Sequence, residues 1–293
     1  MLEIMSENSK MQLTPIDIIR KSAGYLAGVC GGCAGLVFGH PFDTIKVRQQ
    51  TLGGSCGTIA NCLKISLTIE GPRGLFKGLA FPLVSVGLLN GLFFGVYGNI
   101  RPFVGNTYSD MFIAGGIAGA VQGIPGCTIE LIKVKLQSQM GGKNRYQGPY
   151  DCFRKIYMEY GIRGCFKGLP ATICREVIGF GIYITTYEAL CKYGTPEGHQ
   201  QTPIRVMLIA GGLGGVFSWI GNIPMDIIKN RLQADDMKSP TYRNSWHCIV
   251  ASFKKDGARV FWKGLPITCI RAFPVNAVTF AVYSQSFAAI QRL

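Results

Sequence analysis

Residues 41–50 read PFDTIKVRQQ, and the chain repeats this pattern as TIELIKVKLQ at residues 128–137 and as PMDIIKNRLQ at residues 224–233. A second motif follows each copy: a glycine, and six residues later a lysine between an aromatic residue and another glycine. These lysines are Lys77, Lys167 and Lys263. Two motifs that recur three times in the same order identify an internal repeat. We expect one domain over 1–293, with repeats at about 20–104, 105–194 and 202–291.

Long uncharged runs separate the motifs. Only 16% of the 293 residues are charged, whereas soluble proteins average about 25%. Five runs lack Asp, Glu, Lys and Arg, and each has about 20 residues, the length a helix needs to cross a bilayer. They are residues 22–42, 78–100, 111–129, 206–225 and 272–291; a sixth apolar run, 169–190, contains three charges. The pattern predicts an all-α membrane protein with six transmembrane helices, two per repeat, and disfavours a large soluble helical core.

The basic residues behind the net charge of +14 gather in the three long loops inside the repeats. Loops rich in lysine and arginine stay on the side that is not translocated, so all three lie on one face, and an even number of spans puts both termini on the other. Each long loop also holds an amphipathic segment that we expect on the membrane surface, near 59–69, 150–159 and 244–254. The charge therefore reflects topology, and we expect no nucleic-acid partner.

Small residues recur in the odd-numbered spans. Glycines four apart let helices approach closely in lipid, and we expect this of Gly28 with Gly32, Gly115 with Gly119 and Gly211 with Gly215. The eleven cysteines show no metal-ligand spacing. We interpret the C-x-x-C at Cys30 and Cys33 as helix packing rather than a redox or zinc site, and we expect no metal.

The thrice-repeated motif, a proline followed by an acid and two bases, resembles the signature of the mitochondrial carrier family over essentially the whole chain. The resemblance implies a multi-pass solute transporter of the mitochondrial inner membrane, with both termini in the intermembrane space. It also implies a monomer without catalytic residues or a cofactor other than structural cardiolipin. Thr128 stands where the family has proline, so the third helix would bend less sharply or use Pro125.

Acid and base are three residues apart in each motif and so share one helix face. The resemblance implies that they pair between repeats to close the matrix side, with the glutamines as braces; a static ring of salt bridges is the alternative. The matrix-gate residues are Asp43, Lys46, Gln50, Glu130, Lys133, Gln137, Asp226, Lys229 and Gln233.

The opposite gate keeps few charges. Its positions are Tyr97, Arg101, Tyr187, Glu188 and Tyr283. We therefore expect a weak cytosolic gate and a protein that rests open to the cytosol. Gly78, Gly168 and Gly264 match the family's cardiolipin sites, where helix N-termini receive phosphate; interfacial snorkelling of the adjacent lysines is the alternative.

Three charges remain at membrane depth outside these motifs: Arg175, Glu176 and Arg271. The first repeat has Ser85 at the position of the two arginines, and this asymmetry points to a substrate. Two arginines suit a carboxylate, and Glu176 suits a cationic group. Neighbouring residues on a helix diverge by about 100°, so we expect Glu176 to serve the substrate rather than Arg175. Asn90 and Asn276 are further candidate contacts.

The stretches 174–176 and 271–277 resemble the branch with carnitine/acylcarnitine, ornithine and basic amino acid carriers, closest to its less-characterised amino-acid-like members. Ornithine carriers bear an acid in the second helix, and residues 88–90 here have none. This favours a methylated amino acid or carnitine-like betaine over a strictly dibasic substrate. The alternatives are an acylcarnitine/carnitine exchanger and a carrier-fold protein without specific transport, such as a proton leak or organelle-organising adaptor. An enzyme is disfavoured because the three histidines are scattered and no nucleophile motif accompanies them.

Overall fold

The computed structural model describes residues 23–52, 58–105, 107–139, 145–195 and 202–292. Within them the chain forms six long helices and three shorter ones, with no strand. The long helices are α2 (Ala23–Thr51), α4 (Ala80–Ile100), α5 (Tyr108–Ser138), α7 (Leu169–Gly194), α8 (Ile204–Ala234) and α10 (Leu265–Gln291). The short ones are α3 (Ile59–Glu70), α6 (Pro149–Cys165) and α9 (Ser245–Asp256). The all-α expectation of two long helices and one short helix per repeat is confirmed.

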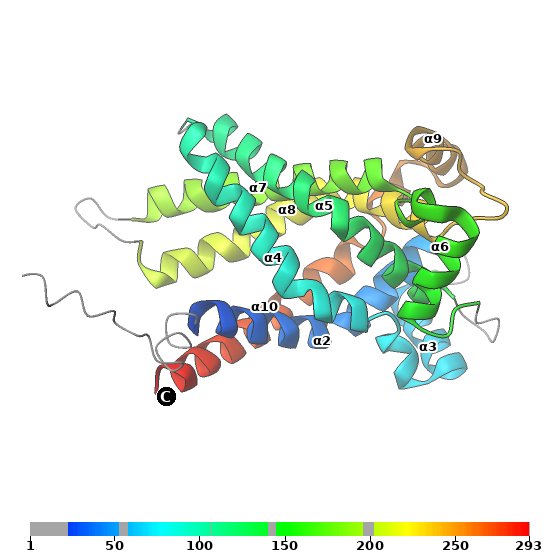
Figure 1. The fold of residues 1–293 in the computed structure, drawn as a ribbon, viewed down its shortest axis with the longest axis horizontal. Helices are drawn as coiled ribbons and strands as arrows, with labels where there is room; N and C mark the ends of the chain where they lie inside the picture. Colours follow the sequence, from blue (N-terminus) through cyan, green and yellow to red (C-terminus); the bar gives the residue numbers. More distant parts are fainter. Residues whose placement is uncertain (1–22, 53–57, 106, 140–144, 196–201, 293) are drawn as a thin grey trace, which may run out of the picture.

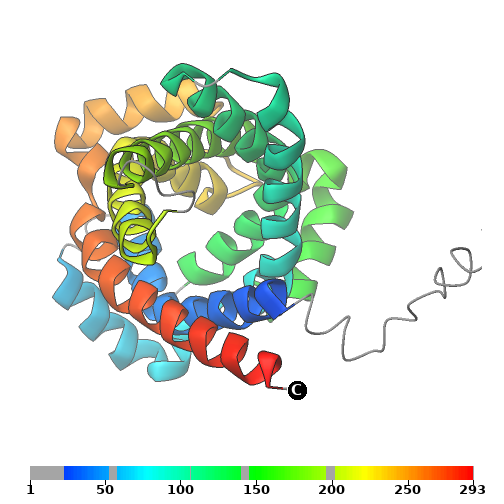
Figure 2. The same cartoon turned by 90° about the vertical axis from the view of Figure 1, so that its left-hand side faces the viewer.

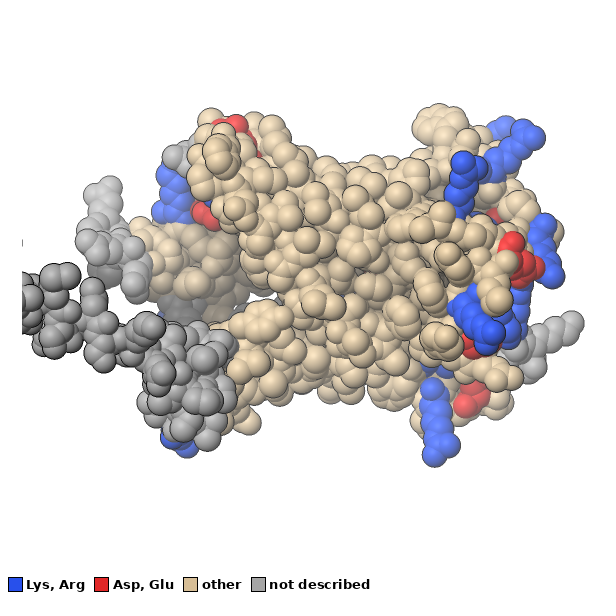
Figure 3. Space-filling view, viewed as in Figure 1, with Lys and Arg blue, Asp and Glu red and all other residues tan. Residues whose placement is uncertain are grey.

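The long helices form a ring when viewed along the long axis of the molecule (Figure 2). All three short helices lie at one end, and α2 begins and α10 ends at the other (Figure 1). The three basic loops therefore share one face. In the space-filling view an uncharged belt separates two charged ends, and lysines and arginines project from the end with α3, α6 and α9 (Figure 3).

Four of the long helices are long and apolar enough to cross a membrane: α2, α5, α8 and the segment Pro72–Phe103 that contains α4. Helices α7 and α10 have 26 and 27 residues. At 1.5 Å per residue, each is about 40 Å long and matches the others in reach. Length and apolar character are thus consistent with the six expected spans, although polar residues make the sequence signal of α7 weaker.

The second motif forms two corners in each repeat. Its first glycine ends α3, interrupts α6 or ends α9, and its second precedes the next long helix. Among the described residues, positive φ occurs only at these six glycines, with angles from +63° at Gly161 to +94° at Gly264. Only glycine adopts this left-handed region without strain, which explains why both glycines recur with fixed spacing.

Close approach at the paired glycines occurs in the second repeat alone. A Cβ atom on Gly115 or Gly119 would lie 2.9 or 2.8 Å from a backbone oxygen of α7. Gly28 and Gly215 have nothing within 4 Å. The expectation is therefore wrong for Gly28 and Gly215. A Cβ atom on Gly32 would lie 3.6 Å from Val86 of α4, and one on Gly211 would lie 3.8 Å from the Tyr183 hydroxyl of α7, which are ordinary contacts.

Helix α5 is continuous from Tyr108 to Ser138 although Thr128 replaces the proline of the motif. Pro125 lies inside this helix, just as Pro41 and Pro224 lie inside α2 and α8. The hydroxyl of Thr128 donates instead to the backbone oxygen of Cys165, at 3.1 Å, and ties α5 to the end of α6.

Candidate functional site

A closed ring of three salt bridges joins the repeats near the end with α3, α6 and α9. Each lysine of the first motif contacts the acid of another repeat, in the same rotational sense. The pairs are Lys46 with Asp226 at 2.8 Å, Lys133 with Asp43 at 2.7 Å and Lys229 with Glu130 at 2.9 Å. The structure thus brings together all six acid and base positions singled out in the sequence.

The three glutamines follow the same rotation, but only one touches a gate acid. Gln50 Nε2 lies 3.5 Å from Asp226, and the Gln50 side-chain oxygen accepts from Asn230 at 2.6 Å. Gln137 donates to the hydroxyl of Thr44 at 3.0 Å, and Gln233 donates weakly to the backbone oxygen of Cys127 at 3.4 Å. These hydrogen bonds join α2 to α8, α5 to α2 and α8 to α5, next to the ring of salt bridges.

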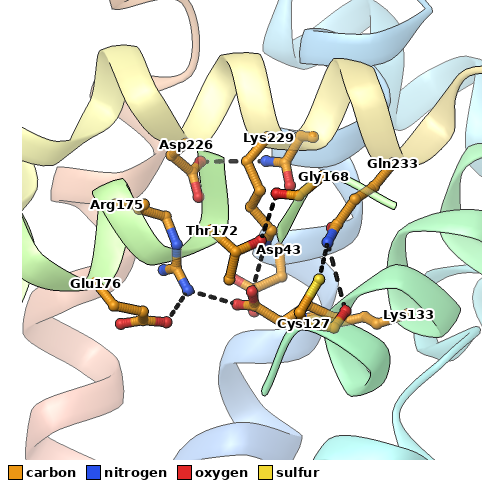
Figure 4. A network of polar contacts seen from close by, with 12 residues as sticks. Asp43, Cys127, Lys133, Gly168, Thr172, Arg175, Glu176, Asp226, Lys229 and Gln233 are labelled. Atoms are coloured by element: carbon orange, nitrogen blue, oxygen red, sulfur yellow. Dashed lines mark hydrogen bonds and ion pairs between the residues drawn. The ribbon is translucent and has the colours of Figure 1, made fainter. Parts of the chain in front are cut away.

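Both membrane-depth arginines bind gate acids. Arg271 lies 2.7 Å from Asp43, and Arg175 lies 2.7 Å from Glu130. Arg175 also pairs with its neighbour Glu176, toward which it points in Figure 4. The expectation that these adjacent residues would not pair is wrong: a guanidinium on a long side chain can donate in several directions and reaches both carboxylates.

The gate encloses a cavity of about 200 Å³ with an excess of positive charge. Three acids line it against five cationic side chains: Lys46, Lys133, Arg175, Lys229 and Arg271. Charge inside a membrane protein is costly unless it is paired. Glu176, which pairs with Arg175 from the adjoining cavity, offsets one of the two excess positive charges, so one remains unmatched, and the cavity can attract an anionic group.

A second cavity, of about 240 Å³, lies between α7 and α8, toward the end of the ring where α2 begins. Its charged lining residues are Arg175 and Glu176, which balance each other, and three of its nine lining residues are aromatic. Phe180, Tyr183, Trp219 and the buried Asn222 contribute to it. Arg175 and Trp219 border both cavities, so the two are adjacent.

Sequence reasoning missed the aromatic residues, although the signal that found the arginines applies to them. Ten residues before the gate lysine the repeats have leucine, glycine and Trp219. Thirteen residues after the motif lysine they have Asn90, Phe180 and Asn276. Broken repeat symmetry marks these positions just as it marks Arg175.

The two candidate asparagines have different outcomes. Asn90 is exposed, on the face of α4 roughly opposite the lipid-accessible Val84 and Leu88, so it faces the interior of the ring. The side chain of Asn276 lies outside the described residues. Ser85, the first-repeat counterpart of the arginines, donates to the backbone oxygen of Phe81 at 2.8 Å within its own helix.

The other candidate gate lies near the opposite end of the long helices. Tyr187 stacks on Tyr183 with ring centroids 6.3 Å apart, and Tyr283 stacks on Phe287 at 6.0 Å. Arg101 donates to the backbone oxygen of Gly105 at 3.1 Å. By contrast, seven salt bridges join different repeats at the end with α3, α6 and α9.

Two surface cavities lie at the glycine corners. One, of about 430 Å³, includes Lys77, Gly78 and the α6 N-cap Gly148; the other, of about 490 Å³, includes Lys263 and Gly264. Gly148 and Gly264 cap their helices without a side-chain hydrogen bond. Backbone N–H groups at such helix starts can receive phosphate.

Comparison with known proteins defines the class. The family model "Mitochondrial carrier protein" matches residues 19–108, 104–195 and 200–292. The chain belongs to the mitochondrial carrier family, and it is a multi-pass solute carrier of the mitochondrial inner membrane. The resemblance stated from the sequence is confirmed.

Individual relatives indicate which members of the family the chain is similar to. The chain is 41% identical to the mitochondrial basic amino acids transporter of Bos taurus, over 88% of each chain. It is 40% identical to solute carrier family 25 member 45 of Mus musculus, over 88% of this chain and 96% of that protein. Member 48 of Bos taurus is 33% identical, over 91% and 95%.

Proposed function

We propose that this carrier moves a small zwitterionic or cationic amino acid, or a carnitine-like metabolite, across the inner membrane by alternating access. One observation carries the proposal: a positively charged cavity at the gate lies directly against a neutral, aromatic cavity that contains Glu176. A molecule with a carboxylate at one end and a cation at the other matches this polarity. The bovine relative is named a mitochondrial basic amino acids transporter, which supports the same substrate class.

The geometry suggests how binding loosens the gate. Arg271 and Arg175 hold Asp43 and Glu130 in the unliganded protein. A substrate carboxylate that engages these guanidinium groups competes with the gate acids, and the bidentate geometry of arginine suits that exchange. Each acid then keeps only its lysine, and repeat one loses a second link to repeat three, from Asp43 to Arg271, which weakens the closed gate.

The orientation and lipid contacts are part of the proposal. The basic face with α3, α6 and α9 lies in the matrix, both termini lie in the intermembrane space, and the protein acts as a monomer. Cardiolipin phosphates bind at the corners of Gly78, Gly168 and Gly264. The candidate cytosolic gate keeps only two charged positions, Arg101 and Glu188, and we expect the protein to rest in the cytosol-open state.

Uptake into liposomes tests the proposal. Purified protein is reconstituted and challenged with labelled amino acids, methylated amino acids and carnitine derivatives. For the transported compound, Arg271→Gln lowers kcat/KM by about 10- to 150-fold, because a charge-assisted contact worth about 1.5–3 kcal/mol is lost. Arg205→Gln, at an exposed site in the first turn of α8, is the matched control and leaves uptake unchanged. No uptake of any zwitterion or cation, or equal rates in both variants, refutes the proposal.

A further inference from the structure

The cavity beside Glu176 has the composition of a site for a weakly hydrated cation. Phe180, Tyr183 and Trp219 supply three aromatic side chains to a space of about 240 Å³. Glu176 supplies a negative charge, and Arg175 binds that same carboxylate. A cation placed here therefore faces more aromatic surface than free carboxylate oxygen.

This composition discriminates between two kinds of substrate cation. A primary ammonium has three N–H donors and is strongly hydrated, so it needs hydrogen-bond acceptors when it leaves water. A quaternary or N-methylated ammonium has few or no donors, and aromatic faces attract it through their quadrupole. The aromatic cavity compensates for dehydration of the second kind far better than of the first.

Trp219 already interacts with cations in the unliganded protein. The ammonium of Lys46 lies 4.0 Å from its ring centroid, and the guanidinium of Arg271 lies 5.7 Å away. The ring is thus placed where positive charge collects, at the border of the two cavities.

We infer that Phe180, Tyr183 and Trp219 form an aromatic subsite that selects substrates with a quaternary or N-methylated ammonium over the matching primary amines. This inference rests on the proposed function and names the substrate class of its cationic end. The carboxylate lies toward Arg175 and Arg271, and the methylated nitrogen lies among the rings near Glu176.

Matched pairs of compounds test the selection. Uptake of 4-aminobutyrate is compared with that of its N,N,N-trimethyl derivative, and uptake of lysine with that of its Nε-trimethyl derivative. Within each pair the carboxylate and the chain length are constant. The wild-type protein prefers the methylated member by at least about tenfold.

Variants of Tyr183 assign the preference to the ring. Tyr183→Leu removes the aromatic face and reduces the preference by about two- to thirtyfold. Tyr183→Phe keeps the face and retains the preference, so it controls for folding and for loss of the hydroxyl. Melting temperatures of both purified variants establish that the protein is folded.

The outcomes separate this inference from the proposed function. If both members of each pair are carried equally well, or if Tyr183→Leu slows both by the same factor, the aromatic subsite is refuted while zwitterion transport stands. If Tyr183→Phe loses the preference as fully as Tyr183→Leu, the hydroxyl and not the ring is responsible, and the inference fails. If neither member is carried, the proposed function itself fails.

Discussion

Loss of Lys46 should open the matrix gate more than loss of either other gate lysine. Asp226 is 3% exposed, and its single ion pair among the described residues is with Lys46. Asp43 and Glu130 each have an arginine as a second cationic partner. Lys46→Gln therefore leaves a buried carboxylate with amide partners only, whereas Lys133→Gln leaves Asp43 paired with Arg271.

The magnitude follows from burial. Removing one partner of a buried ion pair costs about 3–5 kcal/mol. The side chains of Lys46 and Asp226 are 7% and 5% exposed, so this range applies to them. Lys133 and Asp43 are 17% and 15% exposed and Arg271 remains, so we expect about 1.5–3 kcal/mol, the value of one charge-assisted contact. A shift from 1:99 to 99:1 needs about 5.5 kcal/mol, and Lys46→Gln supplies most of it.

Spin-label distances measure the shift. Labels on the carboxyl-terminal ends of α2 and α8, which lie at the end with α3, α6 and α9, report the separation of repeats one and three by pulsed electron paramagnetic resonance in liposomes. We expect a substantial matrix-open population in Lys46→Gln without substrate, and a smaller one in Lys133→Gln. Adding Asp226→Asn to Lys46→Gln removes the unpaired charge and restores part of the closed population. Equal distance distributions in wild type and Lys46→Gln, or a larger opening in Lys133→Gln, would refute the reasoning.

Three further outcomes follow from burial and close packing. Gly119→Ala places a Cβ atom 2.8 Å from a backbone oxygen of α7 and lowers stability by about 1–3 kcal/mol. Gly28→Ala has open space around it and leaves the melting temperature unchanged. Thermal-shift curves of the two variants test this difference. Burial raises the pKa of the Cys152 thiol to about 12, so a maleimide at pH 7–8 modifies this residue only after denaturation, as peptide mapping would register. Glu70→Gln destabilises by about 3–5 kcal/mol, because that carboxylate is 8% exposed and binds two cations. Glu159 also binds two cations but is 37% exposed, so Glu159→Gln destabilises far less; unfolding midpoints distinguish the two.

The repeated part of the molecule could be predicted from the sequence because symmetry makes the signal redundant. The acid and base of each first motif are three residues apart and share one helix face, so three copies around an axis can pair across the repeat boundaries. The fixed spacing of the glycines in the second motif marked their positions, and all six adopt positive φ at corners of the chain. The fold therefore followed from spacing and hydropathy, and the gate pairs followed from the resemblance to the carrier family.

What the sequence could not supply was the direction of long side chains. Helical spacing separates Arg175 from Glu176 by about 100°, yet the guanidinium reaches both Glu176 and Glu130. For the same reason the sequence did not predict that Arg271 contacts Asp43 of a different repeat. Trp219 was passed over because a tryptophan in an apolar helix usually faces lipid or a core, and only its position beside Lys46 indicates otherwise.

The distribution of the arginines bears on why a substrate with two charged ends suits this gate. A carboxylate that engages Arg175 or Arg271 can weaken the closure at Glu130 or Asp43, because those acids share their arginines with it. The third pair, Lys46 with Asp226, involves neither arginine, so an anion alone leaves it intact. Trp219 lies against Lys46 and also lines the aromatic cavity. Under the proposed function, a cationic group in that cavity is the part of the substrate that reaches the third pair, because it competes with Lys46 for the ring. A molecule lacking either end would leave at least one of the three bridges at full strength.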